Sequence, residues 1–528
     1  MTSTPPRLLI ALVGALALHA SACRSHRGPK PSNEATETDP KLEECTLEGR
    51  DEPLEGHCGT LVVPETVGVP ASTRIRIPFI RISKTERAPA VPILWLSGAA
   101  GSTAFLARPP SALARAHDIV IVGTRGVDGG RSLDCPEMAQ AAQARPGLTD
   151  GYITSVARAF EACMARMQGD GVDVTAYGPE SALEDLERVR AMLGYERFAL
   201  VADGFGARLA KLYAARFADR VDRLVYVGAC GDDDLTHDAA CLDSLVAEHV
   251  EACRHSLGCS EHTGRTDWLE AMGRVSTAAP ARWGPFKIDM ARAKASTAAA
   301  MGDPGTAARA IEAWLAADAG SYAGLGLMSW GGDMLLVAGR YWGSAMLWAG
   351  AFAKPEAARR PDESAWSQRA AFTSPVGVLM SRAVREISPP MRAVELAPAA
   401  ARPTLRIRGT CYPPAKAPSA SEGSTAADLG RDDANLIELC APRAGDAVWQ
   451  AFAPTQVADA VLAFLAGTSV DLRGLKPQEA TPYTEGWPLG TIAKLAVGVV
   501  ALLPLTAIVI LVLMFRRFRR TMLRDAGQ

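Results

Sequence analysis

The sequence carries no charge imbalance of the kind that attracts a charged polymer. Its 56 Lys and Arg residues nearly balance 58 Asp and Glu residues, which leaves a formal net charge of −2 at pH 7. Because binding to nucleic acid depends on a basic surface, we exclude nucleic acid as a partner. No internal repeat is visible, and the 48% apolar composition is that of a folded protein.

The sequence also lacks the spacings that hold metal ions. It contains no Cys-x-x-Cys pair and no group of His residues at ligand spacing, so we expect no metal site and no cofactor. Histidine is scarce and is confined to the first half of the chain. The last of the eight His residues is His262.

An apolar run stands near the start of the chain. Arg7 precedes the run from Leu8 to Leu18, which is too short to span a bilayer but is typical of a secretory signal peptide. We assign residues 1–22 to this signal. The segment Ala20-Ser21-Ala22-Cys23 is either a cleavage site with small residues or a lipobox whose Cys23 becomes acylated.

A longer apolar run lies near the other end. Leu495 to Phe515 holds 21 residues without a charge, enough to cross a hydrocarbon core of about 30 Å. This predicts one C-terminal transmembrane helix over residues 491–515, with a buried core helix as the alternative. The basic tail, residues 516–528, would be cytoplasmic. The expected location is then the bacterial inner membrane, with the large domain periplasmic.

Cysteine usage agrees with export. Of 11 Cys residues, ten follow Cys23, and an even number in an exported chain predicts disulfides. Close spacing favours two pairs, Cys45 with Cys58 and Cys253 with Cys259. Three pairs with wider spacing are also considered: Cys135 with Cys163, Cys230 with Cys241, and Cys411 with Cys440.

Short aliphatic runs predict one eight-stranded sheet. The runs are Leu61 to Val63, Ile75 to Ile82, Val91 to Trp95, Ile119 to Val122, Phe198 to Val201, Leu224 to Val227, Leu405 to Ile407 and Leu436 to Leu439. Helical patterns lie between several of them, clearest at Ser181 to Leu193 and Ala207 to Phe217. Alternating strands and helices predict a mostly parallel sheet that is covered on both faces.

The domain boundaries follow from composition. Residues 23–44 are polar and indicate a flexible tether. Residues 231–400 carry Ala, Trp and Met at helical spacing and predict a helical cap. This cap would be inserted between two parts of the core, residues 45–230 and 401–470, and residues 471–490 would be a linker.

One strand, turn and helix has the form of a nucleophile elbow. Phe198 to Val201 is followed by Ala202-Asp203-Gly204-Phe205-Gly206 and then by a helix. With this turn, the chain resembles secreted α/β-hydrolases of the tripeptidyl-aminopeptidase and prolyl-aminopeptidase type over roughly residues 45 to 470. Other matching segments are Cys58 to Pro64, Arg125-Gly126, Gly130-Arg131-Ser132 and Tyr177 to Gly194.

The resemblance implies a Ser-Asp-His triad, and this sequence departs from it at each position. Gly204 stands at the nucleophile position, Tyr412 at the acid position and Asp446 at the position of the base. Because the triad His follows the Ser and the acid in this fold, and no His follows His262, no catalytic base is expected. The oxyanion loop lacks the family's glycine pattern, and its candidate donors are Gly98, Ala99 and Phe205.

These departures favour a pseudoenzyme. We expect a membrane-tethered, extracytoplasmic hydrolase-fold protein that binds a peptide, a small molecule or a partner protein in its capped site. One alternative is an active hydrolase with a relocated triad, using Asp203, or Ser329 in Met328-Ser329-Trp330-Gly331, as its nucleophile. Another alternative is an accessory subunit of a membrane complex.

Overall fold

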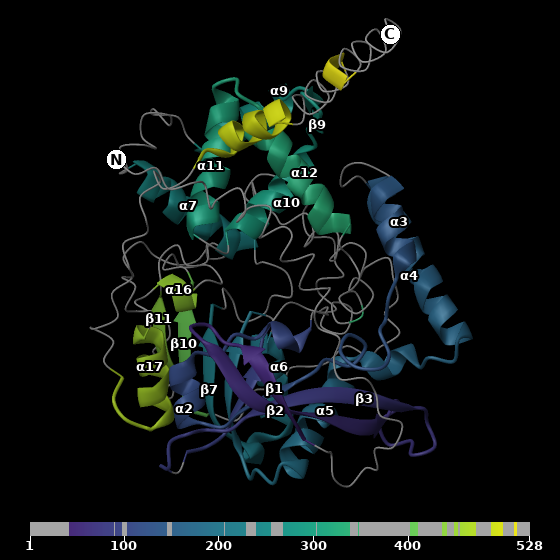
Figure 1. Cartoon of the computed structure of the whole chain (residues 1–528), viewed down its shortest axis with the longest axis vertical. Helices are drawn as coiled ribbons and strands as arrows, with labels where there is room; N and C mark the ends of the chain where they lie inside the picture. Colours follow the sequence, from purple (N-terminus) through teal and green to yellow (C-terminus); the bar gives the residue numbers. More distant parts are fainter. Residues whose placement is uncertain are drawn as a thin grey trace, which may run out of the picture.

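A computed structural model describes most of the hydrolase-like core and much of the helical region (Figure 1). The described residues are 42–88, 90–97, 103–144, 150–204, 206–228, 239–254, 268–301, 304–337, 347, 402–409, 436–440, 448–451, 455–470, 487–499 and 512–514. The predicted signal peptide and Cys23 lie outside them, as do most of the predicted tether and the predicted linker.

Nine strands of the described residues form one sheet at the centre of the fold. Its strand order is β1-β2-β3-β5-β4-β6-β7-β10-β11. The bounds are β1 Glu43–Glu48, β2 Pro53–Pro64, β3 Arg74–Ile82, β4 Ile93–Leu96, β5 Ile119–Val122, β6 Phe198–Asp203, β7 Val221–Val227, β10 Thr404–Arg408 and β11 Leu436–Cys440. The strands β5, β4, β6, β7, β10 and β11 pair in parallel along this order, whereas the pairs β1–β2, β2–β3 and β3–β5 are antiparallel. The prediction of a mostly parallel sheet is therefore confirmed, with one strand more than expected.

The strand sequences match their places in the sheet. The central strands β4 and β5 read ILWL and IVIV and are buried at every residue, because helices cover both faces of a parallel sheet. The antiparallel strand β2 instead alternates exposed and buried residues along most of its length, as a strand with one solvated face does.

Helices cover each face of the sheet. On one face, α5 (Pro179–Met192) and α6 (Gly206–Arg216) pack over Leu94 and Leu96. On the other face, α2 (Ser111–Ala116), α16 (Val448–Ala451) and α17 (Gln456–Leu465) pack over Ile93 and Trp95. Alternate residues of β4 thus enter different cores, which fixes the register of the strand. The short 3₁₀ segments are η1 (Ala104–Leu106), η2 (Val174–Tyr177) and η3 (Ala218–Arg220).

A separate body of helices lies beyond the sheet (Figure 1). It contains α7 (Ala239–Arg254), α9 (Trp268–Ala278), α10 (Met290–Ala300), α11 (Pro304–Asp318) and α12 (Ala323–Val337), with the hairpin β8 (Arg282–Trp283) and β9 (Phe286–Lys287). Its own apolar core includes Trp314, whose indole nitrogen donates to Thr297 at 2.9 Å. At one flank, α3 (Pro136–Ala144) packs along α4 (Asp150–Gly169). The cap boundaries of 231 and 400 lie outside the described residues and stay predictions.

The predicted C-terminal transmembrane helix is wrong for the chain as the structure describes it. No helix among the described residues is long and apolar enough to cross a membrane. Of the predicted span, residues 491–499 and 512–514 are described, and they are helical. The first turns pack on protein, since Ala493 is fully buried and Leu489 joins the core of the helical body. Residues 500–511 and 515–528 lie outside the described part.

Candidate functional site

The turn after β6 has the geometry of a nucleophile elbow. β6 ends at Asp203, α6 begins at Gly206, and Gly204 stands between them with a φ of 52°. This is the left-handed region, which glycine adopts without steric cost. Gly204 has no side chain, so the residue at the apex of the turn offers no hydroxyl, thiol or carboxylate to attack a carbonyl.

The second glycine of the elbow is required by a close approach of the backbone. A Cβ atom on Gly206 would lie 2.1 Å from the carbonyl oxygen of Leu96 and 2.9 Å from the amide nitrogen of Ser97. Leu96 ends β4, so the first turn of α6 presses against the point where the predicted oxyanion loop leaves the sheet. The elbow is therefore tightly fitted even though its apex carries no reactive group.

The remaining predicted catalytic positions lie outside the described residues. These are the oxyanion candidates Gly98, Ala99 and Phe205 and the degenerate positions Tyr412 and Asp446. Their roles stay predictions from the sequence.

Asp203, the first alternative nucleophile, lies on the α2 side of the sheet. Alternation along β6 places it on the same face as Val201, which belongs to that core. The nearby cation is Arg50, whose pKa is lowered by burial and raised by the attraction of Asp203. The Arg50 guanidinium in turn lies 5.4 Å from the centre of the Trp449 ring. Asp203 thus lies beside the elbow on the face of the sheet that Arg50 shares with Trp449.

Ser329, the second alternative nucleophile, is part of the interior of the helical body. It is 1% exposed, and its Oγ accepts a hydrogen bond of 2.9 Å from the backbone nitrogen of Asp289. That contact fixes the start of α10 against α12. The hydroxyl does not follow a strand of the sheet, so it does not stand at an elbow.

Asp128 secures the far end of the predicted oxyanion loop. Its carboxylate accepts hydrogen bonds from the backbone nitrogens of Thr124 at 2.8 Å and Ala104 at 3.0 Å. Burial raises the pKa of Asp128, and its hydrogen bonds oppose this shift. Sequence reasoning missed this residue, because nothing in the sequence shows that a carboxylate after β5 reaches a loop 24 residues earlier.

The segment Arg125-Gly126, one of the resemblance motifs, has a structural role. Arg125 is 1% exposed and makes two hydrogen bonds of 2.7 Å to the carboxylate of Asp185 in α5. Its Nη1 also donates to the carbonyl oxygens of Glu65 at 3.0 Å and Ala176 at 2.6 Å. One guanidinium therefore joins the loop after β5 to β2, η2 and α5.

A second buried contact extends this network. The hydroxyl of Tyr177 donates to the Glu65 carboxylate at 2.5 Å, and Arg131 lies 3.5 Å from the same group. Burial and the neighbouring Glu65 carboxylate raise the pKa of Tyr177, so the phenol stays protonated as a donor. The motif residues Arg125, Arg131 and Tyr177 thus meet at Glu65, directly after β2.

Two disulfides join described cysteines. Cys45 is bonded to Cys58, which links β1 to β2, and Cys135 is bonded to Cys163, which links the start of α3 to α4. Both pairs are among those that the spacing suggested. Of the other candidates, Cys230, Cys259 and Cys411 lie outside the described residues, and the side chains of Cys241, Cys253 and Cys440 are likewise not described.

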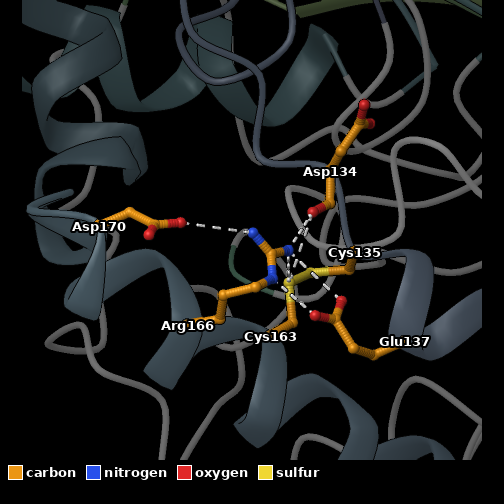
Figure 2. The surroundings of a disulfide bond; sticks show 6 residues. All are labelled: Asp134, Cys135, Glu137, Cys163, Arg166 and Asp170. Atoms are coloured by element: carbon orange, nitrogen blue, oxygen red, sulfur yellow. Dashed lines mark hydrogen bonds and ion pairs between the residues drawn. A yellow bond between two sulfur atoms is a disulfide. The ribbon is translucent and has the colours of Figure 1, made fainter.

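The second disulfide lies within an arrangement of charged groups (Figure 2). Cys135, Glu137 and Cys163 place three ligand-type atoms within 4.8 Å of one another. Both sulfurs are used by the disulfide, however, and Arg166 donates to Glu137 at 2.6 Å and to the carbonyl oxygen of Asp134 at 2.9 Å. Metal binding needs free thiolates and a free carboxylate, so the chemistry of this group is that of a structural crosslink.

Sequence comparison identifies the fold. A family model described as the alpha/beta hydrolase fold matches residues 91–245, a span that contains β4 to β7 and the elbow. The chain has an α/β-hydrolase fold. A curated protein of Escherichia coli (strain K12), "Putative hydrolase YuaR", is 30% identical to the present chain over 129 residues. This match spans 24% of the present chain and 24% of the relative.

Solved structures of hydrolases are also similar. The thermophilic esterase from Thermogutta terrifontis is 12% identical with a TM-score of 0.29, over 77% of this chain and 98% of the esterase. The meta-cleavage product hydrolase from Pseudomonas fluorescens IP01 is 14% identical with a TM-score of 0.32, over 74% and 94% of the two chains. At these values neither structure carries an argument about the site. The aminopeptidase resemblance therefore stays a prediction.

Proposed function

We propose that this chain is an exported, non-catalytic α/β-hydrolase-fold protein whose site binds a ligand or a partner protein and does not hydrolyse it. The observation that carries the proposal is the glycine at the apex of the elbow. Gly204 keeps the backbone conformation that presents a nucleophile in this fold and supplies no nucleophilic atom. Of the two alternative nucleophiles, Asp203 lies one residue before the apex and near Arg50, and Ser329 lies inside the helical body.

The size of the expected catalytic loss supports this proposal. Removing the Ser of a Ser-His-Asp triad lowers turnover on the order of a millionfold, which leaves roughly 10³ to 10⁴ over water. This remaining rate enhancement comes from substrate binding and oxyanion donors alone. It is too small to sustain a physiological peptidase, whereas binding does not require a nucleophile.

The extracytoplasmic location is part of the same proposal. It is supported by the signal-like residues 1–22 together with the crosslinks Cys45–Cys58 and Cys135–Cys163, because structural disulfides persist in oxidising compartments. A cytosolic enzyme would not be expected to retain both.

Turnover assays on the purified protein test the proposal. Peptide p-nitroanilides and short-chain p-nitrophenyl esters would be incubated with the oxidised full-length chain, and the protein would be titrated to show proportionality. We expect no release of product above the rate with heat-denatured protein. Turnover that scales with native protein and survives repurification would overturn the non-catalytic assignment.

A further inference from the structure

An aromatic surface stands on the helical body, on the hairpin β8–β9 and the adjoining part of α12. The rings of Trp283 and Phe286 stack with centroids 6.0 Å apart and planes inclined by 7°. Trp330 lies 6.3 Å from Phe286 and is 45% exposed. We call these three side chains the aromatic hairpin surface.

The hairpin is held closely on α12. A Cβ atom on Gly326 of α12 would lie 3.1 Å from the Cβ of Phe286 and 3.7 Å from that of Trp283. The turn of the hairpin, Gly284 and Pro285, is at least partly exposed. The side chains of Trp283 and Phe286 therefore pack against α12, and Trp330 of the same helix is exposed to solvent. Such a rigid platform loses little conformational entropy when it binds.

Cations flank the rings. Arg282 and Lys287 occupy the two outer positions of the hairpin, and both are exposed. The Arg282 guanidinium donates to the carbonyl oxygen of Pro285 at 3.0 Å, and among the described residues it forms no ion pair. The acidic residue that follows, Asp289, is turned toward Arg292 at 3.9 Å and is largely buried. The exposed charge of the hairpin is therefore positive.

Further apolar residues lie at the same end of α12. Gly490 lies against Ala323 and Gly324, because a Cβ on Gly490 would be 3.7 Å from the Cβ of Ala323. The neighbouring Trp487 is 50% exposed, and Leu495 and Val499 are 41% and 57% exposed. Figure 1 shows this yellow C-terminal helix at the same end of the helical body as β9. Trp487, Leu495 and Val499 thus add to the exposed apolar side chains of the helical body, and such groups are frequent at interaction sites.

We propose that the aromatic hairpin surface contacts an anionic phospholipid bilayer, with Arg282 and Lys287 facing the lipid phosphates. Indole rings favour the boundary between headgroups and acyl chains, where one edge stays hydrated and the ring is covered. Basic side chains next to the rings are attracted to an anionic surface. This contact is peripheral and requires no segment that crosses the bilayer. It is independent of the non-catalytic function proposed above.

Vesicle flotation of the full-length chain tests the contact. The vesicles would be phosphatidylcholine alone or phosphatidylcholine with one quarter phosphatidylglycerol. We expect the Arg282→Gln, Lys287→Gln double variant to bind the anionic vesicles about 30-fold more weakly, since each cation near such a surface contributes about fivefold. Trp330→Ala should weaken binding to both kinds of vesicle. Wild-type binding to anionic vesicles should also fall when the NaCl concentration is raised to about 0.5 M.

Matched controls lie on the opposite body of the molecule. Arg87→Gln removes an exposed cation of the core, and Leu106→Ala removes an apolar side chain that is 51% exposed. Both controls should bind as the wild type does, and all variants should share its thermal midpoint. Equal vesicle binding by the hairpin variants and the controls would overturn the proposal, as would failure of the wild type to float with anionic vesicles.

Discussion

The carbonyl oxygen of Leu96 occupies the space into which a side chain at Gly206 would extend, with only 2.1 Å between that oxygen and the position that a Cβ would take. The elbow thus has the close backbone packing of an α/β-hydrolase elbow, but Gly204 stands at its apex. The architecture of a catalytic turn and its reactive side chain are separate properties of the sequence. A protein can retain the first, and with it a shaped site, after losing the second.

The first prediction concerns this close approach. Gly206→Ala should lower the free energy of unfolding by about 1–3 kcal/mol, because the new methyl group meets backbone atoms that cannot rotate away. Gly273→Ala in α9 is the matched control, since a Cβ there meets nothing within 4 Å. That variant should gain up to about 1 kcal/mol from helix propensity. Urea denaturation measures both, and equal stability of the two variants would argue against the close fit.

The second prediction concerns the apex. Gly204→Ser should cost about 1–2 kcal/mol of stability, because a side chain is now held at a φ of 52°. It should not create hydrolysis, since the sequence supplies no His after His262 to accept the proton of the hydroxyl. Urea denaturation and p-nitrophenyl ester assays check the two parts. Measurable turnover by this single variant would reveal a catalytic base elsewhere in the chain and contradict the non-catalytic assignment.

The third prediction concerns the buried ion pair. Asp185→Ala should destabilise the protein by about 3–5 kcal/mol, because Arg125 would keep its charge in an interior where its side chain is fully covered. The matched control is the more exposed pair Arg274–Asp318, at 2.8 Å, where Arg274→Ala should cost at most about 1 kcal/mol. Chemical denaturation compares the two. Similar losses from both variants would contradict a structural role for the Arg125 network.

The fourth prediction concerns pH. Burial alone would raise the pKa of Asp118, but hydrogen bonds from Tyr195 at 2.6 Å, the Lys84 nitrogen at 2.9 Å and Arg81 at 3.1 Å lower it overall. A lowered pKa means that this carboxylate stabilises the fold above its unfolded pKa of about 3.9, and that the gain is lost as pH falls through the folded value.

Asp118→Asn should therefore cost on the order of 1 kcal/mol at pH 7, and the difference from the wild type should shrink below about pH 4. Denaturation curves at pH 7 and pH 3 measure this change. A difference that is constant across that range would show that the charge of Asp118 is not the source of its contribution.

The central strands and the elbow could be predicted from the sequence because their signals are local. Ile119 to Val122 is a continuous apolar run and forms β5 over the same residues. The edge strand β1 was missed, because EECTLE has few apolar residues, and only its pairing with β2 makes it a strand. The small hairpin β8–β9 was missed for the same reason, since two-residue strands have no periodicity to detect.

Long-range partners could not be predicted. Arg125 stood out as part of a motif, yet its role depends on Asp185, which lies 60 residues later in α5. Asp203 and Ser329 could be considered as nucleophiles from their sequence neighbours alone. The fold places Asp203 near Arg50 and Ser329 against Asp289, and neither neighbour follows from the local sequence. The position of Gly490 against Ala323 and Gly324 of α12 is likewise a long-range contact that the sequence pattern does not show.

The most direct test of the account asks whether the native chain contains an activated nucleophile. The oxidised full-length protein would be treated with a serine-directed fluorophosphonate, and intact mass spectrometry would measure the adduct, with an active serine hydrolase as the positive control. We expect no adduct on the native chain, because Gly204 supplies no hydroxyl at the apex of the elbow. A stoichiometric adduct on one residue, abolished by denaturation, would contradict it.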